Sequence, residues 1–281
     1  MLEHALDAAR AAMAPDDELI VVDSASRSDG TAKVGAEAGA YVVRCDRPGA
    51  ARARNAGWRA AAAPIVAFTD DDCRPRPGWL DAIASAFADD TVGVIVGRVL
   101  PDRESDAIAV SVNTDTERRR FDRPIDPMGV GQSANMACRR EALDDVGGFD
   151  EALGPGARFP NGEDYDLLWR VLAAGWSGLY EPDAVVTHVQ WRTRREGLKA
   201  YYLYGIGDGA FAAKVGRRDR VAGRDMLVDR LWRRGIAQAF RNLRGGYELG
   251  FAADALKAAG VAVGAARCWR VPIDEVGHLL G

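Results

Sequence analysis

The chain has 281 residues, enough for one large α/β domain with an appendage or for two small domains. Its formal net charge of -4 gives no general attraction to nucleic acid, so we expect no nucleic-acid partner. The four cysteines form no CxxC pair, which argues against a zinc knuckle or a disulfide framework and fits a reducing cytoplasm.

The first hundred residues alternate between predicted helices and strands. After an amphipathic helix at residues 2–13, strands are predicted at ELIVVD, YVVRC, PIVAF and VGVIVG, and the helices between them cover residues 31–38, 50–63 and 79–87. Such alternation is typical of a parallel sheet wound by right-handed crossovers. We therefore expect a Rossmann-like α/β fold with a mostly parallel central sheet flanked by helices, and ligands beyond the carboxyl ends of its strands.

The second half of the chain is less regular. The predicted elements are a helix at RREALDDVG, a Gly-rich loop at GPGARFPNG, a helix at EDYDLLWRVLAAG and an extended segment at AVVTHV. Beyond Gln190 the sequence becomes a series of amphipathic helices, which we expect to form a C-terminal helical extension at residues 193–281. No stretch approaches the roughly 18 uncharged apolar residues that a membrane-spanning helix needs.

Three acidic residues directly follow the predicted strand PIVAF. Because side chains alternate along an extended segment, Asp70 and Asp72 should point to one side and Asp71 to the other. Two carboxylates at the mouth of a sheet form the hard-oxygen site that Mg²⁺ or Mn²⁺ favours, with water and substrate phosphate completing the shell. The alternative is an acidic surface turn or a helix-capping cluster.

Several motifs occur in an order and spacing that together point to one family. They are VVDSASRSDGT, GAARARNAGWRAA, FTDDD followed by PGWL, NMACRREALDDVGGFDE, GEDYDLLWR and the late His188. Over residues 18 to about 192 the sequence resembles the inverting glycosyltransferases of family 2, which have the GT-A fold. The resemblance implies a catalytic domain at residues 1–192 that moves a sugar from a nucleotide-diphosphate donor to a hydroxyl acceptor, with Mg²⁺ or Mn²⁺ as cofactor.

The resemblance also assigns residues to the donor site. It implies that Asp23 binds the nucleotide base or ribose, although Asp23 could instead form a turn or cap a helix. Arg54 and Asn55 resemble the Arg-Asn pair that lines the nucleotide pocket. Asp70 and Asp72 match the DxD element, which implies metal contact by Asp72 and ribose or metal contact by Asp70.

Two further positions complete the implied donor site. Asp71, between the two acids of the DxD element, is expected to contribute to cofactor binding. Asn135 follows a run of small residues that would let the backbone approach the donor sugar or the acceptor, and we expect Asn135 to contact it too.

The catalytic base implied by the resemblance is Asp164, with Glu163 as a helper. Both fall in the first turn of a predicted helix, whose dipole favours the ionised form that a base needs. The alternative is that they only complement the helix N-terminus. His188 matches the family's late histidine, which closes over the metal and diphosphate. The alternative is that His188 is a structural residue. We expect residues 70–72, Asp164 and His188 to surround one cation and diphosphate.

One element of the family pattern is missing. Family members begin with a strand and a loop before the first helix, whereas Met1 enters directly into the predicted helix. In the family this strand is central in the sheet, so its absence should leave sheet edges unpaired and remove contacts to the base.

The C-terminal extension is basic. Residues 191–244 carry 14 Lys and Arg against 5 acids, interleaved with Trp191, Tyr201, Tyr202, Tyr204 and Trp232. This pattern suits an interfacial helix and an enzyme whose acceptor is a lipid-linked sugar or another glycan. The alternative is a helical cap that packs its aromatic residues on the catalytic domain. We expect a cytoplasmic protein that contacts the inner membrane face, if at all, peripherally through residues 193–244.

Two other functions compete with sugar transfer. A sugar nucleotidyltransferase would share the sheet and the acidic site, but its Gly-rich phosphate loop near the first strand is not visible in the sequence. A non-catalytic nucleotide- or glycan-binding remnant is favoured by the missing strand. The sequence leaves the donor base, the sugar, the acceptor and the oligomeric state open.

Overall fold

The computed structural model describes residues 1–102 and 111–280, which form two compact units. The α/β unit comprises residues 1–102, 111–149 and 167–190, and the helical unit comprises residues 150–166 and 191–280. Residues 150–166 join the helical unit because Leu153 and Phe159 pack in its core with Ile206. The assignment of catalysis to residues 1–192 stays a prediction.

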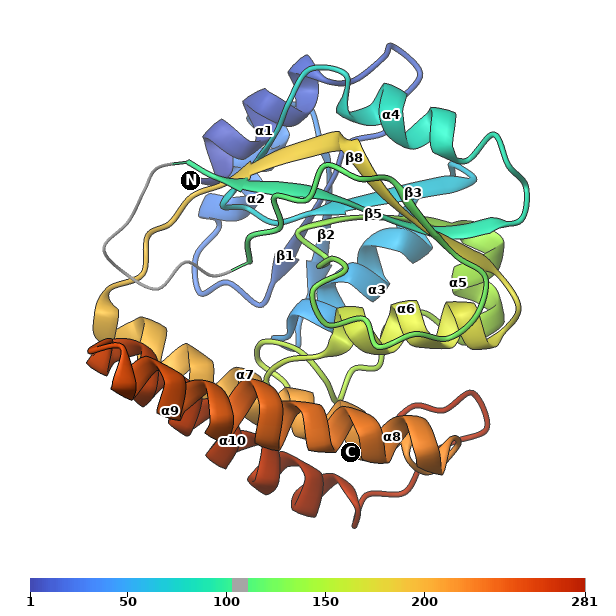
Figure 1. Cartoon of the computed structure of the whole chain (residues 1–281). Helices are drawn as coiled ribbons and strands as arrows, with labels where there is room; N and C mark the ends of the chain where they lie inside the picture. The colour runs from blue at the N-terminus through green and yellow to red at the C-terminus, as the bar shows by residue number, and fades with distance from the viewer. Residues whose placement is uncertain (103–110, 281) are drawn as a thin grey trace. The chain divides into compact units, whose positions relative to one another are not determined.

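The α/β unit contains the alternating elements that the sequence predicts (Figure 1). Its strands are β1 (Ile20–Ser24), β2 (Tyr41–Cys45), β3 (Ile65–Thr69), β4 (Cys73–Pro75), β5 (Val92–Pro101), β6 (Arg119–Phe121), β7 (Asn135–Arg139) and β8 (Ser177–His188). Its helices are α1 (Leu2–Ala11), α2 (Gly30–Glu37), α3 (Ala50–Ala60), α4 (Trp79–Ala86), α5 (Arg140–Val146) and most of α6 (Glu163–Ala173).

The sheet is mixed, which corrects the expectation that it is mostly parallel. The larger sheet has the order β3-β7-β5-β8-β4, with β6 also paired to β8. Among its described pairings only β5 with β8 is parallel. The reason is that β7 and β8 lie beyond the first hundred residues, where the regular alternation stops, and β7 runs antiparallel between β3 and β5.

Strands β1 and β2 form a separate parallel pair. Within the described parts of the chain, β1 pairs only with β2 and β3 only with β7, so each has an edge without a strand partner. The segments leading into β1 and β3 are joined, because the Glu18 carboxylate accepts hydrogen bonds from the backbone N–H groups of Ala62 and Ala63 at 2.8 to 3.1 Å.

The larger sheet buries apolar side chains on both faces. On one face Phe68, Val96 and Met136 pack against α3, α5 and α6. On the other face Ile95 and Val186 pack against α4. Helices therefore cover the sheet on both sides, with α1 and α4 on one side and α3, α5 and α6 on the other (Figure 1).

The helical unit is built on two long helices that approach each other closely. Its helices are α7 (Arg194–Val215), α8 (Arg220–Val228), η1 (Asp229–Ile236), α9 (Ala237–Arg244) and α10 (Glu248–Cys268). A Cβ on Gly209 of α7 would lie 2.0 Å from Val261 O, and one on Gly264 of α10 would lie 1.9 Å from Ile206 O. Only glycine permits this backbone contact. The elements α8, η1 and α9 follow one another without a break.

Helix α10 departs from the expectation that no segment could cross a membrane. Among the described residues it is the one helix that is long and apolar enough by length and composition, with a mean hydropathy of 1.4 over its best window. That window is 28% buried. Asp254 and Lys257 interrupt its apolar run, so the helix contains no uncharged apolar stretch of this length.

Candidate functional site

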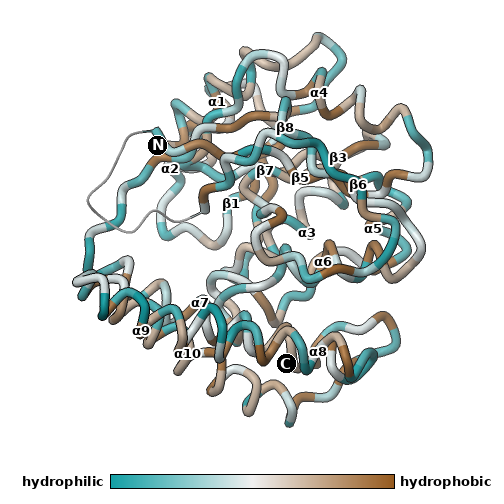
Figure 2. The backbone as a smooth tube through the Cα atoms, viewed as in Figure 1, coloured by the Kyte–Doolittle hydropathy of each residue, from teal (hydrophilic) through white to brown (hydrophobic). Residues whose placement is uncertain are grey.

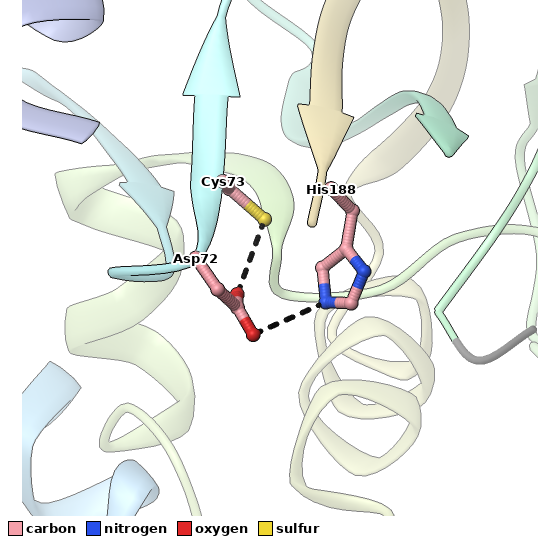
Figure 3. Close-up of side chains that lie close together, drawn as sticks. All are labelled: Asp72, Cys73 and His188. Atoms are coloured by element: carbon pink, nitrogen blue, oxygen red, sulfur yellow. Dashed lines mark hydrogen bonds and ion pairs between the residues drawn. The ribbon is translucent and has the colours of Figure 1, made fainter. Parts of the chain in front are cut away.

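The turn after β3 carries the acidic residues predicted to bind a metal ion. Cys73 N donates to Asp70 O at 3.0 Å, which closes the turn between β3 and β4. Strand β4 then pairs with β8 in an antiparallel register that sets Cys73 opposite His188. This register brings His188 Nε2 to 3.4 Å from Asp72 Oδ2 (Figure 3). Strand pairing thus brings together two of the predicted site residues.

Asp72, Cys73 and His188 each present one ligand atom, and these atoms lie within 4.8 Å of one another. Burial, together with the negative charges of Asp70 and Asp72, raises the pKa of the Cys73 thiol, so the sulfur stays protonated at neutral pH. Carboxylate oxygen suits Mg²⁺ and Mn²⁺, and imidazole nitrogen is a common ligand of transition metals. Asp72 and His188 therefore fit a divalent cation that takes its other ligands from water and phosphate.

His188 is held in place from its own strand end. Gln190 Nε2 lies 2.7 Å from His188 Nδ1. Gln190 N donates to Asp102 Oδ1 at 2.9 Å, and Asp102 N donates to His188 O at 3.0 Å. A hydrogen bond at one ring nitrogen fixes the orientation of an imidazole. Gln190, which the sequence analysis did not single out, therefore directs Nε2 toward Asp72.

The three acids of the turn have different surroundings. Arg54 Nη2 donates to Asp70 Oδ1 at 2.6 Å, and the Arg54 guanidinium lies 5.7 Å from the centre of the Phe149 ring. Asp71 is exposed as a residue, while partial burial of its carboxyl group and the negative charges of Asp72 and Asp70 raise its pKa. Asp70 is thus paired with arginine, Asp72 faces histidine, and Asp71 lies toward solvent.

Asn55 is committed to contacts within the α/β unit. Its side chain Nδ2 donates to Phe149 O at 2.9 Å, and its Oδ1 accepts from Phe149 N at 2.9 Å and from Trp58 Nε1 at 3.0 Å. These bonds fasten α3 to the loop after α5, and Asn55 is 2% exposed. They favour a packing role, while the nucleotide contact implied by the resemblance stays a prediction.

Asn135 is similarly committed. Its Nδ2 donates to Arg98 O at 2.9 Å and to Ala184 O at 2.7 Å, and its Oδ1 accepts from Trp79 Nε1 at 2.8 Å. The pairing of β5 with β8 shifts register between Gly97 and Arg98. The Asn135 amide therefore bonds the backbone where the strand ladder is interrupted. This favours a structural role, and contact with donor or acceptor stays a prediction.

Asp23 lies at the end of β1 and is 4% exposed. Ser26 N donates to its Oδ1 at 3.0 Å, and Arg44, which is opposite Asp23 in the β1–β2 register, donates to its Oδ2. Burial alone would raise the pKa of Asp23, but the hydrogen bonds from Ser26 and Arg44 outweigh it and lower the pKa. Asp23 therefore shapes the turn after β1 as an anion, and its contact with a nucleotide stays a prediction.

Glu163 and Asp164 belong to the helical unit, where they begin α6 as predicted. Asp164 Oδ1 accepts a hydrogen bond from Tyr165 N at 2.8 Å. Gly154, with φ of 98°, lets the preceding loop approach the Glu163 carboxyl, because a Cβ there would lie 2.8 Å from Glu163 Cδ. Burial raises the pKa of the Tyr204 phenol. The negative charges of Glu163 and Asp164 also raise this pKa, while the positive charge of Arg192 lowers it.

Known proteins match this chain in sequence and in structure. The model of the family described as "Glycosyl transferase family 2" matches residues 1–147. A pre-mycofactocin glycosyltransferase of Mycobacterium tuberculosis is 34% identical over 163 residues, which are 56% of this chain and 33% of that protein. Glycosyltransferase AglE of Haloferax volcanii is 26% identical over 223 residues, 76% of this chain and 69% of that protein.

Among solved structures, the mannosyltransferase PcManGT from Pyrobaculum calidifontis, in complex with GDP-Man and Mn²⁺, superposes with a TM-score of 0.62 at 21% identity. The match covers 94% of this chain and 82% of PcManGT. The chain spans only 33% of the length of the mycobacterial relative, so the function of the whole protein has to be argued from the site.

Proposed function

The chain belongs to glycosyl transferase family 2 and has the predicted GT-A fold, and we propose that it transfers a hexose from a nucleotide-diphosphate donor to a hydroxyl acceptor with inversion. The observation that carries the proposal is the pair of Asp72 and His188, 3.4 Å apart beside an Arg-paired Asp70. This arrangement supplies cation ligands in the turn that follows β3, at the place of the DxD element that the resemblance implies.

Asp72 and His188 would hold Mg²⁺ or Mn²⁺, which neutralises the charge that develops on the leaving diphosphate. Asp23, Arg54 and Asp70 contact the nucleotide in this proposal. PcManGT was solved with GDP-Man and Mn²⁺, so we take this donor and this ion as the first pair to test.

In the proposed displacement, Asp164 accepts the proton of the attacking hydroxyl. The acceptor oxygen forms a bond to the anomeric carbon while the bond from that carbon to the diphosphate oxygen breaks, so the configuration inverts. General base catalysis contributes about 10²- to 10⁴-fold. Glu163, the neighbour of Asp164 at the start of α6, assists in positioning the acceptor.

Donor binding is tested by thermal shift with GDP, UDP and their mannose and glucose derivatives, with and without Mn²⁺. We expect stabilisation by a nucleoside diphosphate that needs Mn²⁺ and is lost in Asp72→Asn and in His188→Ala. The control is Asp90→Asn, since the side chain of Asp90 is 98% exposed. Stabilisation that is the same without metal, or unchanged in Asp72→Asn, would contradict the proposal.

Transfer is tested by release of nucleoside diphosphate from the donor that binds. Asp164→Asn should bind this donor with Mn²⁺ as well as the wild type does and should lower the release rate by about 10²-fold or more. Asp144→Asn, an exposed carboxylate on α5, is the matched control. Binding without release in the wild type, for every acceptor tried, would instead favour a nucleotide-binding remnant.

The acceptor in this proposal is a glycan or a lipid-linked sugar. A protein that works on such acceptors in the cytoplasm, at the inner membrane face, needs only a peripheral contact, and residues 193–244 are proposed to supply it. The excess of Lys and Arg over acids in residues 191–244 supports this contact.

A further inference from the structure

One helical face in the helical unit exposes its large apolar side chains. Val228, Trp232, Ile236, Phe240 and Leu243 are spaced by four, four, four and three positions, the repeat of a single helix face. With Tyr247, which lies in the turn between α9 and α10, they form a stripe, called here the η1–α9 stripe, with exposed fractions from 39% at Ile236 to 69% at Tyr247. Figure 2 shows the resulting alternation of hydrophobic and hydrophilic residues along this helix.

The opposite face of the same helix is the one that packs against α10. It carries Arg230, Gly235 and Ala239, which are all buried. A Cβ on Gly235 would lie 2.8 Å from the Cβ of Ala258 in α10, so the approach is close. The helix therefore turns small residues and one arginine inward and large apolar residues outward, the reverse of a helix that covers a protein core. Each side chain of the stripe forgoes part of the stabilisation that full burial of an apolar side chain gives.

Positive charge borders the η1–α9 stripe. The exposed residues Arg233, Arg234, Arg241 and Arg244 lie between its apolar positions. The one acid in residues 228–247 is Asp229, which forms an ion pair with Arg234 at 2.6 Å. This segment is basic in a chain with a net charge of -4, so its charge is local. Arginines that flank Trp, Phe and Leu are the composition of helices that lie in the headgroup layer of an anionic bilayer.

We propose that the η1–α9 stripe docks on an anionic membrane surface, with its apolar side chains entering the headgroup layer and its arginines binding lipid phosphates. This inference deepens the peripheral contact proposed above, but it depends on the helical unit and not on sugar transfer. A second copy of the chain fits less well, because a two-fold pairing of the stripe would set the four arginines against the same four arginines.

The structure also relocates the contact suggested by the sequence. Tyr201, Tyr202 and Tyr204 of α7, counted there as interfacial, are half-buried in the helical unit. Burial raises the pKa of the Tyr201 and Tyr204 phenols. The membrane-facing aromatic residues are therefore those of η1 and α9, and Trp232 is the member of the stripe that the sequence analysis had included.

The test is flotation of the whole chain with vesicles of phosphatidylcholine alone and of phosphatidylcholine with phosphatidylglycerol, at low salt. We expect binding to the anionic vesicles, about a tenfold loss in Phe240→Ser, and about a fivefold loss for each arginine removed in Arg233→Gln and Arg241→Gln. The matched controls are Tyr41→Ser, whose side chain is 66% exposed on β2, and Arg123→Gln and Arg270→Gln, which remove exposed arginines elsewhere.

Three outcomes would overturn the inference. The first is no binding to anionic vesicles at low salt, and the second is an equal loss in Tyr41→Ser and Phe240→Ser. The third is a wild-type dimer, seen by light scattering, that Phe240→Ser splits while vesicle binding is absent. A cooperative thermal unfolding transition of Phe240→Ser without added nucleotide checks that the variant is folded. Vesicle binding that follows the stripe supports this inference even where no transfer is found, so its failure and that of the proposed function are separable.

Discussion

Replacing Asn135 by alanine tests whether this predicted site residue binds a ligand or holds the sheet together. The substitution leaves Trp79 Nε1, Arg98 O and Ala184 O without the partner that lies 2.7 to 2.9 Å away in the folded chain. Leaving one buried polar group unsatisfied costs about 1–3 kcal/mol. Since the three groups share one site, their costs do not simply add, and we expect the free energy of unfolding to fall by about 3 to 5 kcal/mol.

Two buried thiols allow this loss to be measured in each unit separately. Cys138 lies in β7, the strand that Asn135 begins, and Cys268 lies in the core of the helical unit. Both are buried, so a pulse of a thiol reagent during a urea titration labels each only where its unit has unfolded. With a slope of about 2–3 kcal/mol per M urea, the midpoint at Cys138 should fall by about 1 to 2.5 M in Asn135→Ala, while that at Cys268 should not move.

A second substitution separates the individual hydrogen bonds. Trp79→Phe removes the indole donor together with part of a buried ring, so its shift of the Cys138 midpoint combines a lost hydrogen bond with a cavity. The two substitutions should also couple in a double-mutant cycle, since they share one bond. If Asn135→Ala leaves the Cys138 midpoint unchanged but abolishes binding of the nucleoside diphosphate, then the structural reasoning is wrong and Asn135 belongs to the donor pocket.

Three further outcomes follow from buried charges and thiols. Lys214→Met removes the ammonium that lies 2.6 and 2.5 Å from the buried carboxylates of Asp150 and Asp166. Urea unfolding of the helical unit should show a loss of about 3–5 kcal/mol, and no loss would contradict the ion triad. The pKa of Asp23 is lower in the folded chain than in the unfolded chain, where it is about 3.9. The Asp23 anion therefore adds stability above the unfolded pKa, and this contribution is lost as the pH falls through the folded pKa. The difference in unfolding free energy between the wild type and Asp23→Asn should therefore shrink toward low pH. A difference that is constant with pH would contradict a stabilising role of the Asp23 anion. Native protein should show one fast-reacting thiol, Cys45, because the other three cysteines are buried and burial raises their pKa; a second fast thiol in the colour reaction with a disulfide reagent would refute this.

The elements of the α/β unit could be predicted because their signals are local. A run such as IVAF and the helix after it are each specified by neighbouring residues. The direction of the strands could not be predicted in the same way. Strand β7 lies antiparallel between β3 and β5, and this depends on contacts between segments far apart in the chain. The alternating pattern of the first hundred residues was extended to the whole sheet, and β7 and β8 do not follow it.

The proximity of Asp72 and His188 was expected from the motif order, and the register of β4 with β8 explains it. The contacts of Asn55 and Asn135 could not be predicted. An asparagine that lines a ligand pocket and an asparagine that bonds an interrupted strand ladder can have the same local sequence, because the interruption in β5–β8 lies elsewhere in the chain. Gln190 could not be predicted as a site residue for the same reason, because its role depends on its contact with His188 Nδ1.

The η1–α9 stripe shows what apolar periodicity can and cannot establish. The repeat in residues 228–247 was visible in the sequence, and it requires an apolar environment on one helical face. It does not say whether that environment is the protein's own core. The answer comes from the other face, where Arg230 and Ala239 are buried and η1 and α9 pack on α10. Because α10 takes the face with the small side chains, Trp232 and Phe240 stay exposed in the helical unit, and vesicle flotation measures whether a bilayer covers them.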